Sequence, residues 1–170
     1  MYDTISLLKI VEDTVVDGPG FRISLYAAGC VHHCKGCHNP QSWDYANGTL
    51  YSVDQLMEHI LHSKSNITFT GGDPLFQVKA FTELARRIKE RTRKTIWCYT
   101  GYLFETLLDI PAYRDLLPYI DVIVDGPFEE DKRDSKLLFR GSANQRLIDV
   151  QMSLKEKRTI LFAYDPFPVF

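Results

Sequence analysis

The sequence lacks a marked excess of charge of either sign. Its 20 lysine and arginine residues nearly balance 22 aspartate and glutamate residues, which leaves a formal net charge of −2 at pH 7. Proteins that bind nucleic acid or an anionic membrane surface usually carry a clear positive excess, so neither is an expected partner. No apolar run approaches the roughly 20 residues of a membrane span, and the N-terminus lacks the basic-then-apolar pattern of a signal peptide. We therefore expect a cytoplasmic protein with no nucleic-acid and no membrane partner.

Internal repeats, low-complexity tracts and linker-like stretches are also absent. A length of 170 residues corresponds to one domain, and 45% hydrophobic residues suffice to fill its core. We expect a single domain over residues 1–170, with a core at about 5–150 and an aromatic tail at 162–170. Two prolines in that tail disfavour a regular element. The tail is therefore expected either to pack across an edge of the domain or to dock against a partner protein.

Cysteine is scarce and unevenly distributed. Three of the four cysteines, Cys30, Cys34 and Cys37, fall within eight positions, and Cys98 lies far from them. Small secreted proteins stapled by disulfides spread their cysteines along chains too short for a core, which does not describe this chain. A tight group of thiols in a reducing compartment instead favours a metal or iron–sulfur site. Cys98 lies in an apolar segment and is predicted to be a buried core residue.

The apolar residues alternate between strand-like and helix-like periods. Four segments are predicted strands, at 22–27, 66–70, 95–99 and 120–124. Helix-like stripes lie between them, and Ser52 with Gln55 forms a capping box at the start of the first helix. A further strand is predicted at 159–162. Such alternation predicts an α/β fold of mostly parallel strands with the helices outside.

Every unusual motif follows one of the predicted strands. The cysteine-bearing loop follows the first strand, and the loops at 71–74, 100–102 and 125–128 follow the other three. In parallel α/β folds the carboxyl ends of the strands meet at one edge, where the chemistry gathers. We therefore expect these four loops to share one site.

The spacing Cys-x3-Cys-x2-Cys places three thiolates on one short loop. Three ligands on a four-iron, four-sulfur cluster leave one iron open to another ligand. A structural zinc ion is the alternative, with a fourth ligand from His32, His33 or His38. Zinc sites usually combine two Cys-x2-Cys pairs from separate segments, and the chain has no second pair. The spacing thus favours the iron–sulfur cluster over zinc, and each histidine taken singly is predicted to be an exposed loop residue.

The segment 30–40, Cys-Val-His-His-Cys-Lys-Gly-Cys-His-Asn-Pro, resembles the cluster loop of a known superfamily. These are the radical S-adenosylmethionine enzymes, and the likeness is greatest to their small members that activate glycyl-radical enzymes. Three further segments match motifs of those activating enzymes, at 16–22, 70–75 and 97–102.

Two more segments narrow the resemblance to one subgroup. The segments 121–126 and 140–146 are similar to those of the activating proteins of anaerobic ribonucleoside-triphosphate reductases, and the whole resemblance spans residues 5–148. It implies an incomplete (βα) barrel of the radical S-adenosylmethionine type. It also implies that S-adenosyl-L-methionine is cleaved reductively at a 4Fe-4S cluster, and that a glycyl radical forms on the partner reductase. A flavodoxin is the electron donor that the resemblance suggests.

The resemblance assigns roles residue by residue. Cys30, Cys34 and Cys37 would be the cluster ligands. Six residues would contact S-adenosyl-L-methionine: Gly36, Cys37, His38, Gly71, Gly72 and Asp73. The glycines at 71 and 72 would let the backbone approach the methionine part, and Asp73 would anchor its α-amino group. Two positions depart from the wider superfamily, which usually has glutamate in place of Asp73 and an aromatic residue in place of Gly36; the subgroup shares both departures.

Other functions remain open from the sequence. Pyruvate formate-lyase or another glycyl-radical enzyme is an alternative partner, and a zinc-stabilised, non-catalytic binding module is an alternative of a different class. The segment 140–146 has no chemistry that follows from its residues. It is expected to be either a polar turn or a contact with the cofactor or partner.

Overall fold

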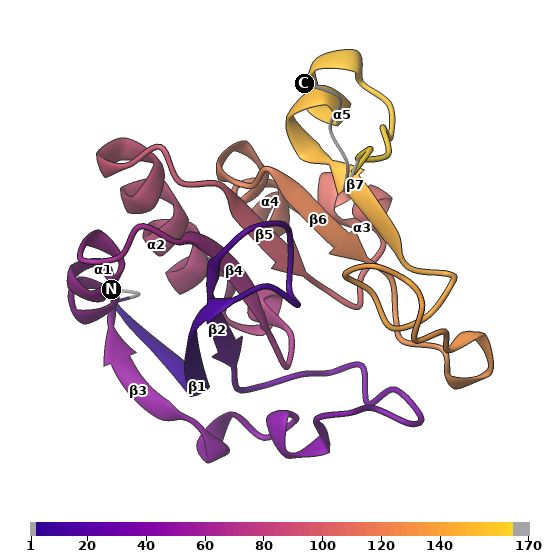
Figure 1. The fold of residues 1–170 in the computed structure, drawn as a ribbon, viewed down its shortest axis with the longest axis horizontal. Coiled ribbons are helices and arrows are strands. Elements are labelled where there is room, and N and C mark those ends of the chain that lie inside the picture. Colours follow the sequence, from indigo (N-terminus) through magenta and orange to yellow (C-terminus); the bar gives the residue numbers. More distant parts are fainter. Residues whose placement is uncertain (1–2, 165–170) are drawn as a thin grey trace.

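The computed structural model describes residues 3–164, which form one open, seven-stranded sheet in the order β3-β1-β2-β4-β5-β6-β7. Figure 1 shows β3 and β7 at opposite ends of this sheet. The strands are β1 (Thr4–Thr14), β2 (Arg22–Ala27), β3 (Thr49–Ser52), β4 (Asn66–Gly71), β5 (Ile96–Tyr99), β6 (Val122–Asp125) and β7 (Arg146–Asp149).

The sheet is mixed. Within residues 3–164, β2, β4, β5 and β6 pair in parallel, whereas β1, β3 and β7 join antiparallel. The four parallel strands match the predicted ones to within two residues at each end. The three antiparallel strands were not predicted, and they make half of the strand pairings antiparallel where mostly parallel strands were expected. In β1 two register shifts interrupt the alternation of buried and exposed residues that marks a strand in sequence.

The predicted strand at 159–162 is wrong. The segment lies along the outer edge of β7, where Asp149 N donates to Ile160 O (2.9 Å) and Phe162 N donates to Leu147 O (2.8 Å). Only one isolated bridge, between Ile148 and Leu161, forms there. Two hydrogen bonds are too few to extend the sheet by a strand.

Three of the helices lie where the apolar stripes predict them, and the fourth and fifth in chain order were not predicted. They are α1 (Val53–Leu61), α2 (Val78–Arg91), α3 (Phe104–Asp109), α4 (Pro111–Arg114) and α5 (Val150–Glu156). The predicted capping box starts α1, since Gln55 N donates to Ser52 Oγ (3.0 Å) and Ser52 N donates to Gln55 Oε1 (2.8 Å). No helix in the described part of the chain is long and apolar enough to cross a membrane.

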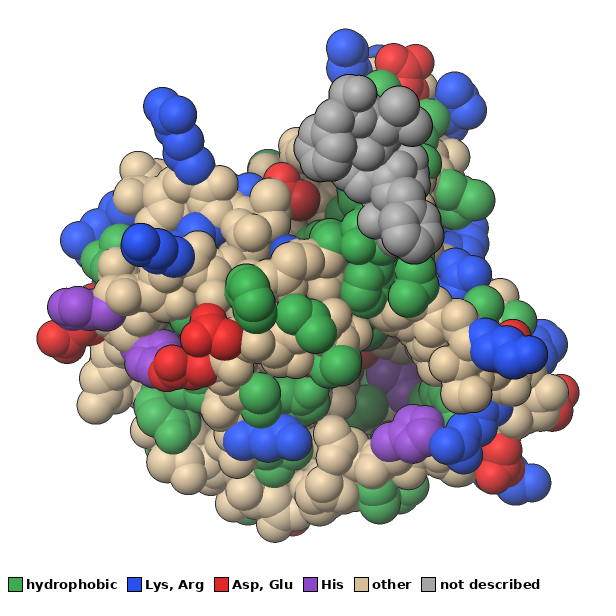
Figure 2. Space-filling view, viewed as in Figure 1, with side chains coloured by type: hydrophobic (Ala, Val, Ile, Leu, Met, Phe, Trp, Pro, Cys, Tyr) green, Lys and Arg blue, Asp and Glu red, His purple; other side chains and the backbone are tan. Residues whose placement is uncertain are grey.

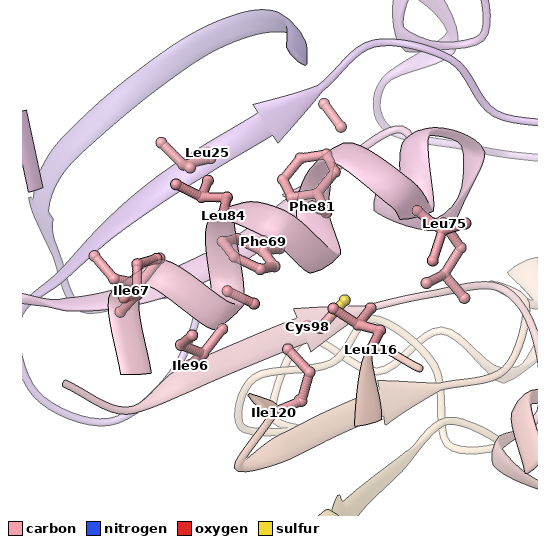
Figure 3. Packing of buried hydrophobic residues seen from close by; sticks show 14 of the residues in the cluster. Leu25, Ile67, Phe69, Leu75, Phe81, Leu84, Ile96, Cys98, Leu116 and Ile120 are labelled. Carbon is pink, nitrogen blue, oxygen red and sulfur yellow. The ribbon is translucent and has the colours of Figure 1, made fainter. Parts of the chain in front are cut away.

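One face of the parallel strands forms the main core with the helices. Figure 3 shows Phe81 and Leu84 of α2 pointing toward Leu25 and Phe69 of the sheet. The Phe69 and Phe81 ring centroids are 4.8 Å apart. Cys98 is fully buried in the same core, as predicted, and burial raises the pKa of its thiol well above the usual range.

The other face of these strands is more polar and holds the loop before β2. Arg22 is buried there, donating from Nε to Thr68 Oγ1 (2.8 Å) and from Nη2 to Ile67 O (2.7 Å). Burial lowers the pKa of Arg22 to about 10, so the guanidinium remains charged at neutral pH. Its Nη1 also donates to Pro19 O (3.2 Å), and this bond holds the segment 16–20 against the sheet.

The start of the aromatic tail packs on this second face. The Phe162 ring lies edge-on to Trp97 (5.4 Å), and Tyr164 lies edge-on to Phe139 (5.1 Å). These contacts are those expected of a tail that packs across the domain. Residues 165–170 lie outside the described part of the chain, so docking of the tail against a partner stays a prediction.

Candidate functional site

The loops that follow the four parallel strands meet in one cleft of about 230 Å³. Figure 2 shows this part of the surface hollowed, with histidine side chains in and beside the hollow. The cleft is lined by Cys30, His32, Cys34, Cys37, His38, Asn39, Ser42, Thr70, Gly71, Gly72, Tyr99, Thr100, Gly101, Gly126, Phe128, Gly141 and Gln145. The expectation that the four loops share one edge is thus met by the geometry.

The three clustered cysteines are all free, partly exposed and in the wall of the cleft. Their loop is held by backbone contacts: Cys30 N donates to Trp43 O (3.2 Å) and Cys37 N donates to Cys34 O (3.1 Å). Asn39 N donates to the Cys37 sulfur, 3.4 Å away. Burial raises the pKa of the Cys30 thiol, and a metal centre bound there would favour its thiolate form.

This donor set fits a four-iron cluster. Three thiols of a single loop line one cleft, which is the number of cysteine ligands that leaves one iron of such a cluster open, and residues of other loops line the rest of the cleft. Within residues 3–164, no three His, Cys, Asp or Glu side chains are grouped so as to hold one metal ion.

Backbone hydrogen bonds link the Gly71–Gly72 turn, at the end of β4, to the end of β2 and to the start of the cysteine loop. Gly72 N donates to Ala27 O (2.7 Å), and Asp73 N donates to Gly29 O (2.9 Å). Gly71 has φ +101°, and a Cβ there would lie 2.3 Å from Ala27 N; a Cβ at Gly72 would lie 2.5 Å from Gly29 O. Only glycine fits this close approach of backbones, which sets the floor of the cleft against the cysteine loop.

Asp73 lies beneath the cleft, bonded to protein on all sides. It is almost fully buried, and its Oδ1 accepts from Leu75 N (2.9 Å). Its Oδ2 faces three groups, His32 Nε2 (2.7 Å), Thr100 Oγ1 (2.9 Å) and Gly101 N (3.0 Å). A carboxylate oxygen has about two acceptor directions, so the three groups fully occupy Oδ2, whereas Oδ1 has one partner among the described residues. The structure thus shows Asp73 as a junction between loops, and its contact with the α-amino group of the cofactor stays a prediction.

The two adjacent histidines of the cysteine loop point in different directions. His32 is half-buried at the junction, with its ring edge-on to Tyr102 (4.5 Å). His33 stacks on Trp43 (4.4 Å, 19° between planes). The prediction that the histidines of this loop are exposed is confirmed for His33 and His38 and wrong for His32, whose partner Asp73 is 41 positions away along the chain. No local pattern identifies that contact.

The three residues of the cysteine loop that were assigned to the cofactor divide between two places. Cys37 and His38 line the cleft, and the His38 ring tilts toward Phe128 (5.3 Å). Gly36 lies against Glu130, where a Cβ would meet the carboxyl group at 2.9 Å. Phe128, from the loop after β6, gives the cleft an aromatic ring that position 36 does not provide.

The segment 140–146 is a polar turn and also one wall of the cleft. Gln145 Oε1 accepts from Gly141 N (2.9 Å), and Gln145 Nε2 donates to Gly126 O (3.0 Å). Asn144 Nδ2 donates to Pro127 O (2.7 Å). These bonds fasten the turn to the loop after β6 and bring Gly141 and Gln145 to the cleft. The interpretation as a polar turn is confirmed, and a contact with the cofactor or partner stays a prediction.

Arg146 closes this wall by pairing with two carboxylates. Its Nε and Nη2 donate to the fully buried Asp125 (3.0 and 2.5 Å), and Nη2 also contacts Glu105 (2.8 Å). The Arg146 guanidinium lowers the pKa of Glu105 to about 2. Asp125 also accepts from Phe104 N, at the start of α3 (2.8 Å).

Replacing Arg146 with methionine should lower the free energy of unfolding by about 3 kcal/mol, because the Asp125 carboxylate is then buried without a counter-charge. Urea denaturation measures this effect. The exposed Lys136→Met variant is the control, with an expected change below about 0.5 kcal/mol. Equal stability of the Arg146→Met variant and the unmodified chain would show that the pair does not hold the turn.

Comparison with known proteins agrees with this geometry. Residues 16–148 match the family model of a 4Fe-4S single cluster domain, which includes the three cysteines and the Arg146 turn. The match supports the iron–sulfur cluster over the zinc alternative.

Relatives of known name cover most of the chain. The protein of Enterobacteria phage T4 is 42% identical over 82% of this chain and 90% of its own length. That of Pasteurella multocida is 40% identical over 77% and 89%, and that of Haemophilus influenzae is 37% identical over 81% and 94%. All three bear one name. The chain belongs to the family of anaerobic ribonucleoside-triphosphate reductase-activating proteins.

Proposed function

We propose that this protein activates an anaerobic ribonucleoside-triphosphate reductase by cleaving S-adenosyl-L-methionine at a 4Fe-4S cluster bound by Cys30, Cys34 and Cys37. The product is a glycyl radical on the reductase. One observation carries the proposal: the three thiols share a cleft with the Gly71–Gly72 turn at the carboxyl edge of the parallel strands. The names of the relatives support the reductase as partner.

The residues of the cleft would bind and orient the cofactor. When bound, the cluster and S-adenosyl-L-methionine together supply one-electron cleavage of the sulfur–C5′ bond. Thr70, Thr100 and Gln145 offer polar side chains to the methionine and ribose parts, and His38 and Phe128 offer rings to the adenine. The glycine turn brings backbone close to the ligand, since no side chain stands between them.

We propose that the open sheet is the incomplete barrel of the radical S-adenosylmethionine type. Its functional loops lie at one edge, and β3 and β7 do not pair with each other. A second hollow of about 270 Å³ adjoins the cleft and shares Tyr99 and Gly141 with it. A glycine-bearing segment of the reductase would enter from this side.

The proposal also includes an electron donor and a cellular location. A flavodoxin is the proposed donor, as in the enzymes that the cysteine loop resembles. A cytoplasmic location agrees with three clustered thiols that are not paired as disulfides.

Anaerobic reconstitution with iron and sulfide tests the proposal. We expect about four irons and matching sulfide per chain, release of methionine on reduction with S-adenosyl-L-methionine, and a glycyl-radical signal by electron paramagnetic resonance when the reductase is added. Binding of one zinc ion and no iron would contradict the proposal. A radical formed on pyruvate formate-lyase but not on the reductase would show that the partner is wrong.

A further inference from the structure

We infer that His32 is a positioning residue that, through Asp73, fixes the cysteine loop over the floor of the cofactor cleft. The inference rests on the proposed function and adds to it a residue that contacts neither the cluster iron nor the reacting atoms. It also assigns Asp73 a role as the anchor of this contact.

The contact is short and shielded from water. His32 Nε2 lies 2.7 Å from Asp73 Oδ2, and the side chains are 15% and 2% exposed. A hydrogen bond to a buried carboxylate is among the stronger ones in proteins. Because His32 stands midway between Cys30 and Cys34, this single bond locates two of the three sulfurs.

Asp73 is a fixed point, not a mobile partner. Its remaining bonds attach it to Leu75 N in the turn Pro74–Gln77 and to Thr100 Oγ1 and Gly101 N at the end of β5, and Asp73 itself follows the end of β4 by two residues. A loop that is bound to Asp73 therefore takes its position from the sheet.

The imidazole ring of His32 packs closely against the loop after β5. A Cβ at Gly101 would lie 2.5 Å from the His32 ring, so the ring fits because residue 101 has no side chain. The Tyr102 ring closes the other side, 4.5 Å away and 75° inclined. Contacts from the loops after β4 and β5 thus converge on His32.

His33 is a natural control within the same loop. It stacks on Trp43, which belongs to the returning part of the loop itself. That contact stabilises the loop without tying it to the ends of β4 and β5, so loss of the His33 ring should leave the position of the cysteines unchanged.

The test compares three variants of the full chain. His32→Leu removes the donor, His32→Gln keeps an N–H near the place of Nε2, and His33→Asn keeps a residue suited to the left-handed backbone at that position (φ 46°). The first measurement is the rate of tryptic cleavage after Lys35, whose side chain is 92% exposed in this loop, before reconstitution. The second is the dissociation constant for S-adenosyl-L-methionine after reconstitution, at equal iron content.

We expect His32→Leu to be cleaved at least about tenfold faster and to bind the cofactor at least about tenfold more weakly, the scale of a lost hydrogen bond to a charged group. His32→Gln and His33→Asn should stay within about threefold of the unmodified chain. Rescue by glutamine separates positioning from general packing, because glutamine restores the donor and not the ring.

Failure of this inference and failure of the proposed function would give different experimental results. Unchanged cleavage and unchanged affinity in His32→Leu would overturn this inference and leave the proposed function intact. An unmodified chain that assembles no cluster would overturn the proposed function, and the cleavage rates would still decide whether His32 holds the loop.

Discussion

Replacing Cys34 with alanine should abolish the cleavage of S-adenosyl-L-methionine. Cys34 is the middle of the three thiols in the cleft, and two ligands do not retain a four-iron cluster with an open site. The residue is partly exposed on a loop, so the fold should survive the change. Iron and sulfide content and methionine release after anaerobic reconstitution measure the effect. Cleavage at the unmodified rate would show that the ligand assignment is wrong.

Cys98→Ala is the matched control for this experiment. Cys98 is fully buried in the helix-facing core, and its raised pKa leaves it a neutral thiol. Its removal should cost about 1 kcal/mol of stability through lost packing and leave the iron content unchanged. Loss of the cluster in this variant would contradict the assignment of Cys98 to the core.

Replacing Gly71 with alanine should be the most damaging change outside the cysteines. The residue has φ +101°, where an L side chain is strained, and the new Cβ would lie 2.3 Å from Ala27 N and 2.6 Å from Tyr26 C. Since both are backbone atoms between paired strands, they cannot move aside cheaply. We expect a loss of more than about 3 kcal/mol of unfolding free energy, measured by urea denaturation, together with loss of cofactor binding.

The Gly20→Ala variant separates the strain of the left-handed backbone from the steric clash of the new Cβ. Gly20 also has a left-handed φ, +71°, but no atom lies within 4 Å of a Cβ at that position. The backbone strain alone should cost about 1 kcal/mol and leave cofactor binding intact. Equal losses in the two variants would mean that the contact between the glycine turn and β2 has no energetic weight.

The sequence predicted the features that neighbouring residues determine. The strand at 22–27 has the bounds of β2, because its apolar residues alternate without interruption. The start of α1 follows from Ser52 and Gln55, since a capping box is made within four residues. The spacing of the three cysteines favoured an iron–sulfur cluster over zinc, because three thiols lie on one short loop, and the resemblance then assigned them as the cluster ligands.

The sequence did not predict features that depend on distant partners. The strands β1, β3 and β7 were missed, and the short bridge at Leu161 was taken for a strand. The role of Arg146 was unassigned, since its buried partner Asp125 lies 21 positions away. Such pairings become visible only when the strands are placed in order across the sheet.

The junction at Asp73 shows most clearly which features follow from neighbouring residues and which depend on distant ones. Composition and motif were enough to indicate a cluster-binding, one-domain protein with its loops at one edge. They were not enough to show that the Asp73 carboxylate is shared by His32, Thr100 and Gly101, because those residues come from two other loops. Local chemistry therefore determined what the cysteine loop can bind. Only the tertiary structure decided what holds that loop in place, because hydrogen bonds to a buried carboxylate depend on how the strands end in space.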